Sequence, residues 1–273
     1  MGNLPLNVEL KDKVIVITGA GGVLCMFAEA VAKAGANVAV LDLNIEAAKA
    51  VAENITEQGG TAIAYKADVL DKEAMLNVRE QVRKELGLCD MLINGAGGNN
   101  PRATTAKEYF VPGDAEDGVT SFFDLDKAGI EFVFNLNFIG TLIPTQIFAQ
   151  DMVGRKSGAI VNISSMNAYR PLTKVPAYSG AKAAISNFTQ WLAVHFSKAG
   201  IRVNAIAPGF FSTAQNRELL YNDDGTPTPR TGKILAATPM GRLGEKEELI
   251  GTLLYLLSSE ASGFVTGVVI PVD

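Results

Sequence analysis

Short apolar runs rich in β-branched residues alternate along the chain with longer stretches of helical periodicity. Seven runs are predicted as strands: Val14 to Thr18, Asn37 to Asp42, Thr61 to Lys66, Met91 to Asn94, Ala159 to Ser164, Arg202 to Ala207 and Val268 to Val272. Helices are predicted over Phe27 to Ala36, Ile45 to Gln58 and Lys72 to Leu86. Runs that are apolar throughout are typical of strands buried on both faces of a parallel sheet, and each helix can form a right-handed crossover. The pattern therefore predicts a doubly wound, Rossmann-type α/β fold with a parallel seven-stranded sheet and helices on both faces.

Two segments interrupt this alternation. They cover about 99–130, which contains the acidic sequence GDAEDG, and about 210–240, which contains YNDDGTPTPRTG. Ligands of doubly wound sheets bind beyond the carboxyl ends of the strands, so we predict both segments as substrate-side loops or lids. The alternative, that their Gly, Pro and Asp residues form only surface turns, stays open.

Composition narrows the class of protein. With 273 residues, 48% hydrophobic and 19% charged, the chain is expected to form a single domain over 1–273. The net charge of -5 and scattered basic residues argue against nucleic acid as a partner and favour a small molecule. We find no apolar run of membrane-spanning length and no signal peptide, which predicts a cytoplasmic protein without a membrane partner. The two cysteines have no metal-like spacing, so no metal site is expected.

The sequence VIVITGAGG runs from a predicted strand into a Gly-rich turn that contains Gly19, Gly21 and Gly22. The free N–H groups of a helix that begins there attract a pyrophosphate. Asp42 ends the next strand, where its carboxylate can accept hydrogen bonds from both hydroxyls of an adenosine ribose and would repel a 2′-phosphate. We therefore favour NAD over NADP. The alternative role for Asp42 is a helix cap, but Asn44 is better placed for that, which would leave Asp42 free.

Further residues at strand ends are candidates for the adenine and ribose portions of the cofactor. They are Asp68 and Val69 after the third strand, and Asn94, Ala96 and Gly97 in the turn NGAGG after the fourth. From pattern alone, ordinary turn residues remain the alternative.

Tyr178 and Lys182 are four residues apart in a predicted helix and share one face of it. A neighbouring ammonium group favours the ionised phenol, which makes tyrosine a usable acid or base. Such a pair often arises by chance, so its weight depends on the motifs around it.

These motifs occur in one order along essentially the whole chain, and in this the sequence resembles the short-chain dehydrogenase/reductase family. TGAGG resembles the Gly-rich turn of that family, ADV its adenine contact, NGAG its NNAG-like turn, NISS with YSGAK its catalytic residues, and APGFFST the segment that closes over the nicotinamide. The resemblance implies an enzyme acting on CH–OH groups with the catalytic residues Asn137, Ser165, Tyr178 and Lys182. It adds these residues to the cofactor contacts: Val23, Leu24, Tyr178, Lys182, Pro208, Gly209, Phe211 and Thr213.

The resemblance also implies the reaction. Ser165 and Tyr178 would hydrogen-bond the substrate carbonyl oxygen, and Tyr178 would supply the proton as hydride arrives from the nicotinamide. Lys182 would hold the nicotinamide ribose and lower the pKa of Tyr178, while Asn137 would orient a water. Ser165 is preferred to Ser164 because 178 minus 165 gives the 13-residue spacing usual in the family.

The Gly-rich turn departs from the family pattern TGxxxGxG, which would place glycines at Val23 and Cys25. A turn one residue shorter would make Gly22 the second glycine and put Leu24 at the third. Both registers stay open, and the third glycine is lost in either. The sequence also stops at Asp273, where relatives continue with Gly-Gly, so we expect that a carboxyl-terminal piece is missing.

Longer stretches such as NGAGGNNPRATT and SSMNAYRPLTKVPAYS resemble one group of the family, the short-chain fructuronate reductases or D-mannonate oxidoreductases. This implies interconversion of D-fructuronate and D-mannonate. A sugar acid needs a cation for its carboxylate and polar groups for its hydroxyls. Candidates are Arg102, Asn167, Arg170, Lys174, Asn216 and Arg217, each with plain surface exposure as the alternative. Rival functions are a gluconate 5-dehydrogenase-like activity on another polyol or aldonate, and a non-catalytic nucleotide-binding protein.

The helix after Lys182 carries an apolar stripe with Phe188, Trp191 and Leu192, typical of core or of a helix–helix seam. The family resemblance implies a homotetramer built through such helices. His195, the only histidine, is predicted to serve packing or a subunit interface rather than catalysis.

Overall fold

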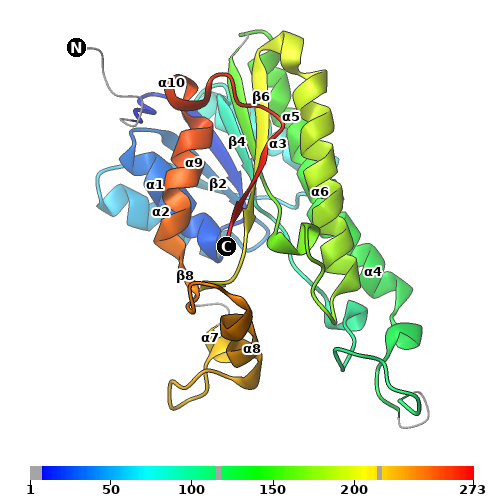
Figure 1. The fold of residues 1–273 in the computed structure, drawn as a ribbon. Coiled ribbons are helices and arrows are strands. Elements are labelled where there is room, and N and C mark those ends of the chain that lie inside the picture. The colour runs from blue at the N-terminus through cyan, green and yellow to red at the C-terminus, as the bar shows by residue number, and fades with distance from the viewer. Residues whose placement is uncertain (1–7, 115–117, 156, 214–216) are drawn as a thin grey trace.

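A parallel seven-stranded sheet forms the centre of the molecule in a computed structural model that describes residues 8–114, 118–155, 157–213 and 217–273 (Figure 1). The strand order is β3-β2-β1-β4-β5-β6-β9. The strands are β1 (Val14–Thr18), β2 (Asn37–Asp42), β3 (Thr61–Lys66), β4 (Met91–Asn94), β5 (Gly158–Ile163), β6 (Ile201–Pro208) and β9 (Val269–Val272). Each predicted strand is found within one residue of its expected ends, and the predicted fold class is confirmed.

Helices cover both faces of the sheet (Figure 1). One face carries α1 (Val23–Lys33), α2 (Ile45–Glu57) and α9 (Ile250–Leu257), and the other carries α3 (Lys72–Glu85), α5 (Gly140–Val153) and α6 (Pro176–His195). Phe27 and Leu253 are fully buried in the first layer, and Met75 and Phe148 in the second. The predicted start of the first helix at Phe27 is wrong by one turn, because Gly22 caps α1 with a backbone (φ 59°) that only glycine adopts readily.

The remaining elements are short and lie mostly in two segments at the carboxyl ends of the strands. They are η1 (Pro101–Ala103), η2 (Phe122–Asp124), α4 (Lys127–Phe134), η3 (Asn135–Ile139), η4 (Met166–Ala168), η5 (Ser197–Ala199), β7 (Phe211–Ser212), α7 (Arg217–Leu220), α8 (Pro229–Ala237), β8 (Gly244–Glu245), η6 (Lys246–Leu249) and α10 (Ser259–Ser262).

Two projections extend beyond the end of the sheet (Figure 1). One is an arm, which we define as the described part of residues 99–126, and the other carries α7 and α8. The two touch, since Lys233 Nζ on α8 lies 2.9 Å from Glu108 Oε1 on the arm. The long segments predicted as loops therefore meet at the edge where ligands of this fold bind.

Residues Lys127–Val153 form one helical run of 27 residues with a mean hydropathy of 1.4 in its most apolar window. The expectation that no apolar run reaches membrane-spanning length was wrong. Half of that 18-residue window is buried inside the fold, as in the core helix of a soluble protein. The run packs against the sheet and against α6.

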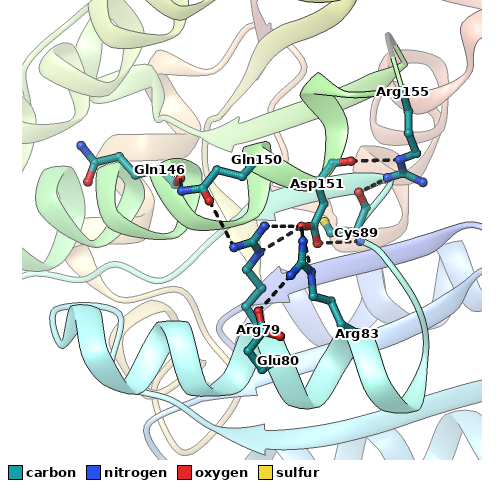
Figure 2. A network of polar contacts seen from close by, with 8 residues as sticks. All are labelled: Arg79, Glu80, Arg83, Cys89, Gln146, Gln150, Asp151 and Arg155. Atoms are coloured by element: carbon teal, nitrogen blue, oxygen red, sulfur yellow. Dashed lines mark hydrogen bonds and ion pairs between the residues drawn. The ribbon is translucent and has the colours of Figure 1, made fainter.

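Asp151 on α5 connects this helix with α3 and with the residue before β4, as Figure 2 shows. This network lies at the amino ends of the strands, away from the two projections (Figure 1). The Oδ1 atom of Asp151 accepts hydrogen bonds from Arg79 Nε at 2.9 Å and Arg83 Nε at 3.1 Å. Its Oδ2 accepts one at 3.1 Å from the N–H of Cys89, which lies just before β4. Because Arg79 and Asp151 are both buried, the charges compensate each other there and fix α3 and α5 against the start of β4.

Candidate functional site

The Gly-rich turn passes directly from β1 into α1. Gly19 has φ 94° and lies against the turn after β4, where a Cβ on Gly19 would be 3.3 Å from the Ala96 nitrogen. Gly22 is the N-cap of α1 and supplies no side chain to its first turn. The helix begins at Val23, so the structure supports the shorter of the two registers, with Gly22 as the second glycine. An uncapped helix N-terminus of this kind favours a bound pyrophosphate.

A cavity of about 580 Å³ opens in front of this turn at the ends of β1, β2, β3 and β4. Many of the predicted cofactor contacts line it: Gly19, Gly21, Gly22, Val23, Leu24, Asp42, Asp68, Val69, Ala96, Gly97 and Thr213. Gly95, Leu43 and Leu136 line it as well and were not predicted. No polar or Gly-rich signal marks the two leucines, although Gly95 belongs to the quoted NGAGG turn.

Asp42 is engaged rather than free. Its Oδ2 accepts a hydrogen bond at 2.7 Å from the N–H of Ala20 in the Gly-rich turn, and its Oδ1 accepts one at 2.8 Å from the N–H of Asn44. Asn44 caps α2, as predicted. Each carboxylate oxygen of Asp42 retains acceptor capacity for a ribose hydroxyl. Asp42 therefore ties the end of β2 to the turn and still presents its charge to the cavity.

Asn94 does not line the cavity. Its Nδ2 donates hydrogen bonds to Thr145 Oγ1 and Asn162 Oδ1, both at 2.9 Å, and the side chain is buried. The prediction of Asn94 as a cofactor contact is corrected to a role in joining β4, β5 and α5. The sequence pattern does not reveal this orientation, because a side chain at a strand end can point to either face of the sheet.

The segment after β6 also sits differently from the prediction. Gly209 donates its N–H to the Val272 carbonyl at 2.8 Å, and a Cβ on Gly209 would lie 1.8 Å from Asp273 Oδ1. Phe211 is buried against Gly244. Pro208, Gly209 and Phe211 do not line the cavity, whereas Thr213 does.

Ser165, Tyr178 and Lys182 come together at the end of β5. Ser165 follows the strand and caps η4, and Tyr178 lies in the first turn of α6, where its phenol interacts with Ser165. Lys182 Nζ donates a hydrogen bond of 2.8 Å to the Ile163 carbonyl and lies 5.6 Å from the centroid of the Tyr178 ring. The serine, phenol and amine predicted from the sequence are therefore neighbours. Neither Tyr178 nor Lys182 lines the 580 Å³ cavity.

The electrostatics differ from the expectation at this pair. Burial raises the pKa of Tyr178, and the hydrogen bond with Ser165 offsets only part of that rise. Burial lowers the pKa of Lys182 to about 8. The expected lowering of the Tyr178 pKa is not seen in this structure, because a dry environment disfavours both charged forms and the amine is bound to a carbonyl.

Asn137 lies in the π-helical turn η3 and is fully buried. Its Nδ2 donates to the carbonyls of Val133 at 2.8 Å and Gly98 at 2.7 Å. A Cβ on Gly97 would be 2.6 Å from Asn137 Oδ1 and 3.3 Å from Lys182 Nζ, so Gly97 brings these two side chains to the edge of the cavity. Single π-helical turns inside α-helices are frequent at functional sites.

The predicted substrate residues are dispersed around this centre. Asn167 donates its N–H to Ser165 Oγ at 3.2 Å, whereas Arg170 and Arg217 are exposed. Arg102 forms an ion pair with Asp126 inside the arm. Asn216 lies outside the described residues.

Lys174 has a left-handed backbone (φ 76°), which is unusual for a residue other than glycine. Its carbonyl accepts a hydrogen bond from the N–H of Thr105 on the arm at 2.9 Å. It lines a second cavity, of about 250 Å³, between the arm and residues 172–176. No pattern in the sequence indicates that the arm packs beside the start of α6.

The aromatic stripe of α6 lies away from both cavities. His195 is exposed and stacks on Trp191 with the ring centroids 4.7 Å apart, while Leu192 is buried in the core. Within the described ranges, the acidic, histidine and cysteine side chains form no group of three or more that could hold a metal ion.

Comparison with known proteins identifies the family of the chain. A family model described as short chain dehydrogenase matches residues 13–224. An uncharacterized oxidoreductase of Haemophilus influenzae is 60% identical over 99% of this chain and 95% of its own, and one of Bacillus subtilis is 51% identical over 99% and 96%. The crystal structure of a candidate D-mannonate oxidoreductase from Haemophilus influenzae, with bound NAD, matches with a TM-score of 0.94 and 58% identity over 99% of this chain and 97% of that one.

Proposed function

The chain belongs to the short-chain dehydrogenase family, and on this premise we propose that it interconverts D-fructuronate and D-mannonate with NAD(H) as the hydride carrier. The observation that carries the proposal is the meeting of Ser165, Tyr178 and Lys182 beside a cavity whose lining suits a dinucleotide, with Lys182 next to Gly97 at the cavity edge. The sugar acid is inferred from the 58% identical relative with bound NAD.

The residues around the larger cavity fit the cofactor. The first turn of α1 faces it with uncapped N–H groups, and Asp42 presents acceptors at the far end. When bound, NAD(H) supplies or accepts the hydride. Gly97 is small enough to let Asn137 and Lys182 approach the same edge, where Lys182 would hold the nicotinamide ribose.

The catalytic roles follow from position and chemistry. Ser165 and Tyr178 would hydrogen-bond the substrate carbonyl oxygen, and Tyr178 would give it the proton during reduction. The raised pKa of Tyr178 keeps the phenol protonated before reduction, as a general acid requires. Lys182 lies beside Tyr178, and Asn137 lies next to Lys182 at Gly97; these two would return the proton through a water that Asn137 orients.

Lys174 is the best-placed cation for the substrate carboxylate. It lies four residues before Tyr178, on the segment that the arm holds through Thr105. Its left-handed backbone is a strained conformation of the kind that clusters at ligand sites. Arg102 is less available, since Asp126 already pairs with it.

A panel of initial rates tests the proposal. Oxidation of NADH is followed with D-fructuronate and with 5-keto-D-gluconate, and each assay is repeated with NADPH. Fast turnover of D-fructuronate with NADH is expected. Preferential turnover of 5-keto-D-gluconate would support the aldonate alternative, and binding of NADH without turnover of any sugar acid would favour the non-catalytic alternative.

We also propose a cytoplasmic homotetramer assembled through α4 and α6. Trp191 and Val194 are exposed on α6, and Phe132 and Phe134 are exposed on α4, which gives an apolar face suited to a second copy. Light scattering of the purified protein measures the mass of the assembly, which should equal four times the 28.9 kDa of one chain.

A further inference from the structure

Leu24 and Gly95 lie against each other in the lining of the cofactor cavity. A Cβ built on Gly95 would clash with Cδ1 and Cγ of Leu24, so the leucine side chain would have to shift to admit any other residue at this position. Leu24 is in the first turn of α1 and is 7% exposed, and Gly95 follows directly after β4. Both residues line the cavity. The leucine therefore occupies the space that any residue other than glycine would need at position 95.

Each of the two residues is a departure from the family pattern. Leu24 stands at the place of the third glycine of the Gly-rich turn, whose usual purpose is close packing of helix and strand. Gly95 stands at the second Asn of the NNAG-like turn. One side chain has been gained on α1 and one has been lost on the facing turn, so the space between the two elements stays filled.

We infer that Leu24 and Gly95 are a complementary pair that positions the Gly-rich turn for the cofactor. Gly95 cannot move away, because its N–H is held by both the hydroxyl and the carbonyl oxygen of Thr18, each at 3.1 Å. The contact of Leu24 with Gly95 thus fixes the distance between α1 and the end of β4. The first N–H groups of α1 bind the pyrophosphate only if that distance is kept.

Two other contacts also hold the Gly-rich turn in place. The contribution of Leu24 and Gly95 to its position can therefore be measured separately. Ala20 is bound to Asp42, and Gly19 lies against Ala96. Neither involves Leu24, so a change at the pair displaces the start of α1 while β1 and Gly19 stay in place. The inference concerns cofactor binding and does not depend on the identity of the sugar acid.

A double-mutant cycle tests the pair with NADH affinity as the readout, measured by fluorescence titration of the full chain. Gly95→Ala adds a methyl group against Leu24 and is expected to weaken NADH binding by about tenfold, as overpacking of a rigid site does. Leu24→Ala removes the clashing atoms. The double variant Leu24→Ala/Gly95→Ala is therefore expected to bind NADH at least about fivefold more tightly than Gly95→Ala alone. Additive effects of the two changes, or an unchanged affinity in Gly95→Ala, would overturn the inference.

Leu253→Ala is the matched control. Leu253 is fully buried in α9 and packs in the same core as α1, but it does not line the cavity. It should lower the thermal midpoint and leave the NADH affinity of the folded protein within about twofold, since cavity formation costs stability at any core site. An equal loss of affinity in this control would mean that general destabilisation explains the effect, and would also overturn the inference.

A family-type exchange covers the case in which Gly95→Ala fails to fold. Leu24→Gly/Gly95→Asn restores the usual residues at both positions and is expected to fold and to bind NADH within about threefold of the parent chain, because side-chain volume is returned to the same space. Gly95→Asn alone should not bind. Failure of the double exchange to recover binding would show that the two residues do not act as a pair.

Discussion

The amine of Lys182 lies 5.6 Å from the centroid of the Tyr178 ring, and burial shifts the pKa of each group toward its uncharged form. This arrangement favours a protonated phenol next to an amine whose pKa is lowered to about 8. It makes the pair suited to pass a proton rather than to hold a fixed charge.

Tyr178→Phe should separate binding from chemistry. It removes only the phenol oxygen that we assign as the proton donor, so turnover should fall by about 10²- to 10⁴-fold, the usual contribution of a general acid. NADH affinity should stay within about threefold, because the ring remains. Steady-state rates and fluorescence titration measure the two quantities.

The matched control for that variant is Tyr65→Phe. The Tyr65 hydroxyl donates to Glu85 Oε2 on α3 at 2.8 Å, far along the chain from the proposed site. Its loss should cost only stability, about 1 kcal/mol, and leave turnover unchanged. Turnover of Tyr178→Phe equal to that of the control would refute the assigned acid.

Lys182→Met should change how stability depends on pH. The pKa of Lys182 is lowered from 10.5 to about 8 by burial, so the unfolded chain binds more protons than the folded one between these values. The free energy of unfolding of the parent chain should therefore rise with pH over this window, by about 2 kcal/mol from pH 8 to pH 10 relative to the methionine variant. Measurements stop at pH 10, because the raised pKa of Tyr178 acts in the opposite sense above it. Urea unfolding curves that run parallel with pH for the two proteins would show that the buried amine does not have the lowered pKa.

Much of the fold could be predicted because its signals are local. The apolar runs of β2, β3 and β4 and the cap at Asn44 are visible in a few consecutive residues each. The start of α1 at Val23 was missed because VLC continues a Gly-rich run and its packing partner, Gly95, lies far along the chain. Contacts of that range leave no periodic trace in either segment.

The candidate site also divides into features with local sequence signals and features set by distant contacts. Ser165, Tyr178 and Lys182 follow from spacing on one strand end and one helix, and the structure brings them together. Asn94 was misassigned because its orientation depends on partners in α5 and β5. The direction of the Tyr178 pKa shift depends on burial by surrounding elements, which a pair of residues in sequence does not reveal.

Asp42→Asn should weaken the preference for NADH over NADPH. The substitution removes the negative charge that disfavours a 2′-phosphate and replaces one of the two oxygens that bind Ala20 and Asn44. Loss of a charge-assisted hydrogen bond is worth about 1.5–3 kcal/mol. The ratio of kcat/KM with NADH to kcat/KM with NADPH should therefore fall by about 10- to 100-fold. Asp68 is another carboxylate that lines the cavity, so Asp68→Asn is the control and should keep the preference for NADH. An unchanged ratio in Asp42→Asn would remove the basis for choosing NAD from this residue.

Asp151→Ala should destabilise the fold without touching the chemistry. It leaves the buried Arg79 guanidinium and the Cys89 N–H without their acceptor at the end of the sheet opposite the cavities. Removing one partner of a buried ion pair costs about 3–5 kcal/mol, which denaturant unfolding detects. The control is Glu80→Ala, which breaks only the exposed contact of Glu80 with Arg83 at 3.0 Å and should cost less than about 1 kcal/mol. NADH affinity of the folded protein should be the same in both variants. A small and equal loss of stability in the two would mean that Asp151 is not the residue that holds α3 and α5 to the start of β4.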